Sequence, residues 1–212
     1  MEEPRVWLVT GSFRGLGRAV VVAAAGSGAR VMAAARRPDD VADLVAAFPG
    51  RVEVVRLDVT NPAGARRAVR DTVEAFGRVD VVTGGNAGDG ADLRERIEAD
   101  LFGVVHVTEA ARPTLRDGTF VQVTTGRAEA AQLAAEGYFE ADVAPLGIRV
   151  IIVTVGDDCD PARAAQAIVR VVAEDDPPRR LPLGAGALTT ALETGAARLA
   201  ETERWADVSK SV

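Results

Sequence analysis

The sequence predicts an α/β protein built on a single doubly wound parallel sheet with helices on both faces. Apolar runs typical of buried strands alternate with helical patterns along the chain, and parallel strands need such helical crossovers. Several of these apolar runs end in glycine-rich turns, and the first turn joins its strand directly to a helix. This alternation is typical of the Rossmann-like architecture.

The first strand, turn and helix fall in residues 6–20, VWLVTGSFRGLGRAV. Gly11 can adopt the angles of a tight turn, Gly15 leaves no side chain between backbone and ligand, and Gly17 lets the helix pack on the strand. The N–H groups and positive dipole end of that helix would then point at a pyrophosphate. Because glycine turns also serve ordinary strand-to-helix connections, the pattern is weak evidence by itself.

The next segments continue the alternation. Residues 18–26 predict a helix ended by glycines, and residues 29–35 predict a second buried strand. Residues 39–48 carry an amphipathic helix pattern that Pro49 and Gly50 end, and a third strand follows at 52–57. Asn61 and Pro62 start a helix that runs to Phe76, before a fourth strand at 80–83.

The second half of the chain continues this series of strands and helices. Residues 93–115 form a long helical pattern, which a fifth strand at 119–125 and a sixth at 148–155 follow. Asp160 and Pro161 start another helix. After two prolines at 177–178, residues 181–184 suit a last strand and residues 187–205 predict a C-terminal helix.

Length and composition indicate one domain over residues 1–212 without a linker. The net charge of -6 argues against a nucleic-acid partner. Cys159 is the only cysteine, which excludes an intrachain disulfide and fits a reducing compartment. We expect a cytoplasmic protein with no membrane partner, because no signal peptide or membrane-spanning apolar run is present. We expect no metal site, and His106 to be a satisfied helix residue.

The glycine turn has the spacing Thr-Gly-x-x-x-Gly-x-Gly, and further motifs follow at 57–60 (LDVT), 85–88 (GNAG), 100–104 (DLFGV) and 145–150 (PLGIRV). In this order they resemble the short-chain dehydrogenase/reductase family over nearly the whole chain. The resemblance implies a nicotinamide cofactor and a small-molecule carbonyl or alcohol substrate. It implies a cofactor half over about residues 1–118, and a reduced catalytic half over residues 119–212.

The resemblance and the residues together predict NADP(H). Ala35 stands where NAD-type members of the family carry aspartate, and Arg36 follows it, so an arginine is available for the 2′-phosphate. Arg14 in the glycine turn points the same way. The alternative interpretation of Arg36 and Arg37 is a solvated pair at a strand end. The predicted cofactor-binding residues are Gly11, Ser12, Arg14, Gly15, Leu16, Gly17, Arg36, Arg37, Asp58, Val59, Asn86, Ala87 and Gly88.

Two sets of these residues match family motifs, one more completely than the other. Asp58 and Val59 resemble the family's contact with the adenine edge. Asn86, Ala87 and Gly88 match a motif that begins Asn-Asn-Ala-Gly in the family, but Gly85 replaces its first asparagine. A glycine-rich strand end could also be only a turn, and its place in the strand and helix series favours the cofactor interpretation.

The predicted catalytic residues are Thr125, Tyr138 and Asp100, and they depart from the family. Thr125 stands at the substrate-orienting serine, and Asp100 at an asparagine that holds a water in the proton relay. A lysine should follow the catalytic tyrosine by four residues and lower its pKa, but Asp142 stands there. Either Tyr138 is the family's tyrosine, or the segment is the end of that helix and the catalytic part is deleted.

Three functions remain open at this point. The protein is an NADP(H)-dependent oxidoreductase with an altered proton relay, a non-redox enzyme such as a cyclase, dehydratase or aldol-type enzyme that reuses the pocket, or a binding protein without chemistry. The family's long substrate lid after the sixth strand is also missing. Because the family pairs through the helix that is shortened here, we expect a monomer or a non-classical dimer.

Overall fold

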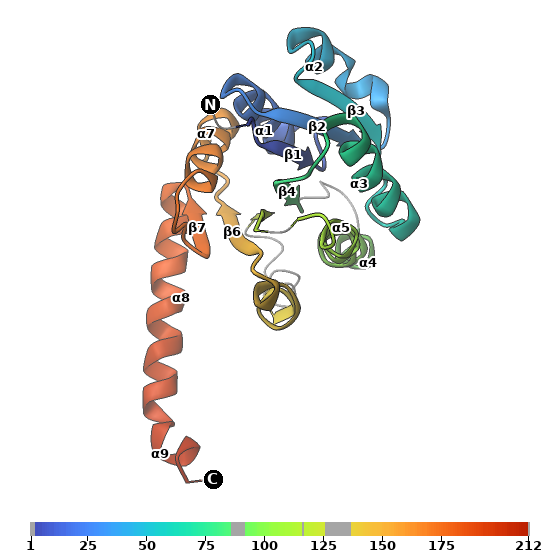
Figure 1. The fold of residues 1–212 in the computed structure, drawn as a ribbon. Helices are drawn as coiled ribbons and strands as arrows, with labels where there is room; N and C mark the ends of the chain where they lie inside the picture. The colour runs from blue at the N-terminus through green and yellow to red at the C-terminus, as the bar shows by residue number, and fades with distance from the viewer. Residues whose placement is uncertain (1–2, 86–91, 116, 126–136, 212) are drawn as a thin grey trace.

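The computed structural model describes residues 3–85, 92–115, 117–125 and 137–211. In these residues a seven-stranded sheet, parallel throughout, has the order β3-β2-β1-β4-β5-β6-β7 (Figure 1). The predicted doubly wound α/β fold is therefore confirmed. The strands are β1 Val6–Val9, β2 Arg30–Ala35, β3 Val52–Arg56, β4 Val81–Gly84, β5 Thr119–Thr125, β6 Arg149–Val155 and β7 Arg180–Leu183.

The helices cover both faces of this sheet, and each predicted helical region contains one or more of them. The helical elements are α1 Gly15–Gly26, η1 Pro38–Val41, α2 Ala42–Ala47, α3 Pro62–Phe76, α4 Leu93–Ile97, η2 Glu98–Phe102, α5 Gly103–Ala111, η3 Phe139–Val143, η4 Ala144–Leu146, α7 Pro161–Val172, α8 Ala185–Arg204 and α9 Ala206–Ser209.

The core has two layers because side chains alternate along each strand. Trp7 and Val9 of β1 pack in one layer with α1 and α7, whereas Leu8 packs in the other with α3 and α5. Both layers consist mainly of valine, alanine and leucine, and all three of these β1 side chains are at most 2% exposed. A strand buried on both faces explains the unbroken apolar run that predicted it.

Several predicted boundaries differ from the structure. Helix α1 begins at Gly15, inside the glycine turn, rather than at residue 18. The helix predicted over 93–115 is divided by a π-helical turn, η2, and α5 ends at Ala111. Pro113 has no N–H to donate to the preceding turn, so the helix cannot continue regularly through it. Residues 39–48 contain the 3-10 turn η1 and the short α2 in place of one helix.

Helix α8 extends away from the sheet and its covering helices (Figure 1). Its first turn is held by Asp158, whose Oδ2 accepts the Ala185 N–H at 3.1 Å, and by the burial of Ala187. The predicted C-terminal helix over residues 187–205 is confirmed with bounds that differ by one or two residues.

Candidate functional site

The site lies where the strand order reverses, between β1 and β4. β1 pairs with β2 on one side and with β4 on the other, so the crossovers leave in opposite directions at this point. Thr10 continues from β1, and both its N–H and its Oγ1 donate to the Thr83 carbonyl, at 3.2 and 3.0 Å. In open α/β sheets, ligands bind at such a reversal, outside the carboxyl ends of the strands.

The turn between β1 and α1 has the backbone geometry of a phosphate cradle. Gly11 and Gly15 have φ angles of +63° and +53°, a region that favours glycine. A Cβ on Gly17 would lie 2.4 Å from the Gly11 carbonyl oxygen, so α1 approaches the turn as closely as only glycine permits. Helix α1 presents its unpaired N–H groups here. These three glycines therefore fit a dinucleotide pyrophosphate.

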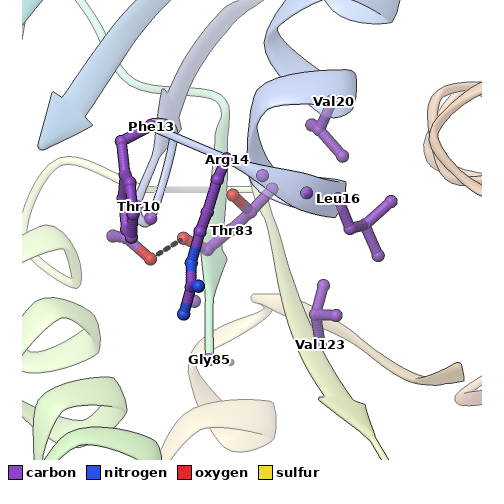
Figure 2. Close-up of a pocket in the computed structure, with 12 residues that line it drawn as sticks. Thr10, Phe13, Arg14, Leu16, Val20, Thr83, Gly85 and Val123 are labelled. Carbon is purple, nitrogen blue, oxygen red and sulfur yellow. Dashed lines mark hydrogen bonds between the residues drawn. The ribbon is translucent and has the colours of Figure 1, made fainter. Parts of the chain in front are cut away.

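A cavity of about 190 Å³ opens beside this turn. The side chains of Leu16, Val20 and Val123 provide apolar surface, and the ends of β1 and β4 provide polar backbone. Figure 2 shows the Arg14 side chain extending alongside Phe13, with its guanidinium carbon 5.1 Å from the ring centroid. The sequence argument missed Phe13, which lines this cavity and the next, because an aromatic residue in a turn carries no family motif.

A larger cavity of about 660 Å³ continues from the turn toward the ends of β2 and β3. Arg36, Asp58 and Val59, three of the predicted cofactor-binding residues, line one side of it. Asp58 Oδ1 accepts the Thr60 N–H and hydroxyl at 3.1 and 2.8 Å, which shapes this loop. Helices α4 and α5 form the opposite wall, where sequence reasoning missed Arg94, Glu95, Glu98, Ala99, Val104 and Val107.

Helix α5 packs against the side of this cavity that Val59 lines. Gly103 packs directly on Val59, since a Cβ on Gly103 would lie 2.7 Å from the Val59 Cγ2. His106 Nδ1 lies 3.0 Å from the Val59 carbonyl oxygen. The prediction that His106 is a satisfied helix residue is therefore confirmed, and the residue supports the site from behind.

Gly85 has a structural reason for replacing the family's asparagine. Its φ is +105°, and a Cβ there would lie 2.1 Å from the Val123 carbonyl oxygen. The end of β4 therefore touches the β5 backbone at a point where a side chain cannot stand. Asn86, Ala87 and Gly88, the rest of the predicted motif, lie outside the described residues.

The side chains of two predicted cofactor residues make contacts away from both cavities. Ser12 is fully buried, and its hydroxyl donates to the Ala34 carbonyl at 2.9 Å, so its side chain ties the turn to β2 and does not line either cavity. Arg37 Nε lies 3.1 Å from Asp40 Oδ2 and also lies outside both cavities. Prediction from the turn spacing could not tell which way these side chains point.

Two of the predicted catalytic residues, Asp100 and Tyr138, are not among the described residues that line the two cavities. Asp100 is buried in η2, and its neighbours Ala99 and Gly103 line the larger cavity while Asp100 does not. Thr125 is the last residue of β5, paired with Val155, and its side chain lies outside the described part. The connection from β6 to α7 spans only residues 156–160, so the expected absence of a long lid at this point is confirmed.

Tyr138 faces α5 rather than the glycine turn. Its hydroxyl donates to Glu109 Oε1 at 2.7 Å, and burial together with that carboxylate raises the pKa of the phenol far above its ordinary value. The neighbouring Phe139 packs on Phe120, near the start of β5, with ring centroids 5.0 Å apart. Neither cavity is lined by Tyr138. This geometry favours the interpretation in which the segment is the end of a shortened helix.

Metal-ligand clusters and membrane-spanning helices are both absent from the described residues. No cluster of three or more histidine, cysteine, aspartate or glutamate side chains there is arranged to hold a metal ion. No helix within the same residues combines the length and the apolar character that crossing a membrane requires.

The fold and the glycine cradle at the strand reversal are those typical of dinucleotide-binding α/β proteins. Comparison with known proteins identifies the family within this class. A family model described as short chain dehydrogenase matches residues 5–139. The protein named oxidoreductase BOA17 from Botryotinia fuckeliana is 31% identical, over 97% of this chain and 98% of the relative. The chain therefore belongs to the short-chain dehydrogenase family and is an oxidoreductase-like member of it.

Solved structures agree with this assignment. A short-chain dehydrogenase from Streptomyces avermitilis is similar with a TM-score of 0.85 and 29% identity, over 99% of both chains. An alcohol dehydrogenase from Thermococcus sibiricus, complexed with 5-hydroxy-NADP, has a TM-score of 0.76. It is 21% identical over 85% of this chain and 96% of that chain, which is a likeness of fold alone.

Proposed function

We propose that this protein binds NADP(H) and acts as an oxidoreductase on the carbonyl or alcohol group of a small molecule, with a non-standard proton relay. The observation that carries the proposal is the continuous surface from the glycine cradle to Arg36. Phe13 and Gly11 line both cavities, so the two cavities adjoin at the turn. A dinucleotide needs such a surface, with its pyrophosphate at the turn and its adenosine at the ends of β2 and β3.

The charge at the end of β2 supports NADP(H) over NAD(H). Ala35 supplies no carboxylate for the ribose hydroxyls, and Arg36 lines the adenosine cavity. The described residues place no ion-pair partner on Arg36. A guanidinium without a carboxylate partner is suited to a 2′-phosphate. When bound, the nicotinamide would supply hydride transfer, and Gly11, Gly15, Gly17 and Arg36 would hold the phosphates.

In this proposal the proton relay differs from the family's. The Tyr138 phenol is engaged by Glu109 and has a raised pKa, whereas an effective general acid has a pKa near the working pH. In the oxidoreductase proposal Thr125, at the end of β5, orients the carbonyl, and water or another group supplies the proton. The substrate would lie outside the carboxyl ends of the strands.

A second candidate is a nucleotide-binding protein without catalysis. Two observations favour it: the Tyr138 hydroxyl points to Glu109, and β6 joins α7 through residues 156–160 without a long lid. Without a lid, water would reach the reacting atoms and weaken electrostatic stabilisation. This candidate keeps cofactor binding and loses turnover, so it is separated from the first by kinetics alone.

Isothermal titration calorimetry with NADPH and NADH tests the binding proposal. We expect NADPH to bind more tightly by about 1.5–3 kcal/mol, the range for hydrogen bonds to charged groups, and Arg36→Ala to remove most of this preference. Arg37→Ala is the matched control, because Arg37 is paired with Asp40 outside the cavity. Equal affinities for NADPH and NADH in the unmodified protein would contradict the proposal, as would a preference that survives Arg36→Ala.

A further inference from the structure

Helix α8 presents a row of exposed leucines to solvent. Leu188, Leu192 and Leu199 are 48%, 65% and 61% exposed, although the helix is 20 residues long and stands off the body (Figure 1). Its only buried residue is Ala187, in the first turn. Large apolar residues gathered on one face of a projecting helix are typical of an interaction surface.

The spacing of these residues is that of a coiled-coil seam. Leu188, Leu192, Gly195 and Leu199 follow one another at intervals of four, three and four residues. This is the alternation of d and a positions in a heptad, and it places all four on one side of the helix. Thr202 and Ala206 continue the same series. Ala191 and Ala196 flank the middle of the seam, so a second helix could approach closely there.

We propose that α8 pairs with α8 of a second copy of this chain as a parallel two-stranded coiled coil. The charges next to the seam select this occupant and this direction. Arg198 and Glu203 occupy g and e positions separated by five residues, and in a parallel pair a g residue meets the e residue five positions on in the partner. A two-fold axis therefore forms the Arg198–Glu203 pair twice.

Among the described residues, the same two charges, Arg198 and Glu203, have no ion-pair partner within one chain. An antiparallel pair in which Leu188 faces Leu199 would place Arg198 beside Ala191 and leave both charges unmatched. A parallel pair also leaves the buried side of α8, marked by Ala187, away from the seam, so each body remains attached to its own helix.

Sedimentation or light scattering of the full chain over about 1–100 μM tests the pairing. We expect the mass to rise from one chain to two, and Leu192→Glu to hold it at one chain over this range. Ala197→Glu is the matched control, because it adds the same charge on the opposite side of the exposed helix and should leave the dimer intact. The proposal would be overturned if the unmodified protein stays monomeric, or if Leu192→Glu does not weaken the dimer.

Charge reversal tests the direction of the pair. Arg198→Glu and Glu203→Arg should each raise the dimer's Kd roughly threefold or more, by replacing attraction with repulsion, and the double variant should restore it. Thr202→Cys in a Cys159→Ala background should form a disulfide-linked dimer under mild oxidation. In an antiparallel pair the two cysteines would lie about 25 Å apart along the axis. No rescue by the double variant and no cross-link would refute the parallel arrangement.

Discussion

At the scale of single residues, the glycine turn depends on contacts that no other residue can make. Gly17 and Gly26 both lie in α1, but only Gly17 faces another backbone, the Gly11 carbonyl oxygen. A Cβ on Gly26 would have no atom within 4 Å. The two positions therefore separate the cost of losing a close approach from the ordinary effect of replacing glycine in a helix.

We predict that Gly17→Ala lowers the free energy of unfolding by about 1–3 kcal/mol, because the new methyl group must push the turn away from α1. It should also weaken NADPH binding, since the turn carries the phosphate site. Gly26→Ala should be neutral or stabilise the fold by a few tenths to about 1 kcal/mol. Urea denaturation followed by circular dichroism measures both. Equal effects of the two variants would show that the turn tolerates a side chain at residue 17.

At the scale of elements, the segment after β5 explains why the catalytic pattern is incomplete. Phe139 and Val143 bury their side chains against the core layer of α3 and α5, which fixes the orientation of this short helical segment. Tyr138 then points to Glu109 on α5. A residue four positions on, Asp142, is exposed. Packing of the apolar side chains thus decides where the only tyrosine points.

We predict that Tyr138→Phe leaves any NADPH-dependent turnover within about a factor of two, whereas losing a general acid costs 10²–10⁴-fold. It should cost roughly 0.5–1.5 kcal/mol of stability through the lost hydrogen bond. Because the folded-state pKa of Tyr138 is raised, the unfolded chain ionises first above pH about 10 and stability falls there. Because it has no phenol at this position, Tyr138→Phe should not show this part of the loss of stability at high pH.

Steady-state kinetics and denaturation between pH 8 and about 11 measure these effects, with the ordinary phenol pKa of about 10 inside that interval. Asp142→Lys is the companion variant, because it introduces the family's residue at the family's spacing. If Tyr138→Phe abolishes turnover, the tyrosine is the acid and the helix is not merely a shortened remnant. If the protein is active and neither variant changes its turnover, the chemistry does not depend on this segment.

At the scale of the whole molecule, the two halves of the sheet differ in how their strand ends are covered. The ends of β1, β2, β3 and β4 surround two adjoining cavities. On the other side, β6 is joined to α7 by residues 156–160 alone. We propose that the family's usual assembly through the helix after β5 is also lost, and that α8 supplies a different contact.

We predict that the unmodified protein turns over simple ketones with NADPH slowly or not at all, even when NADPH binds. In the proposed mechanism no tuned acid is available, and without a lid water would reach the site and screen the developing charge. Absorbance at 340 nm, the NADPH band, follows the reaction, with calorimetry as the control for binding. Brisk NADPH oxidation with several unrelated ketones would contradict the impaired relay.

Local patterns in the sequence are sufficient to predict the layer architecture, the order of strands and helices along the chain, and the glycine cradle. Apolar runs predict the buried strands, and Asn61 caps α3 as its position predicts. The positive φ angles at Gly11 and Gly15 favour glycine. Such signals lie within a few residues of the element that they specify.

The directions in which the side chains of the site point, and the distant residues that meet there, depend on the packing of the whole fold. Ser12 and Arg37 lie in the predicted motifs, yet Ala34 and Asp40 take their polar atoms. Gly85 is required by Val123, a residue on another strand. These contacts form between segments far apart in the chain, so no local pattern records them, and packing between layers sets them only when the sheet is complete.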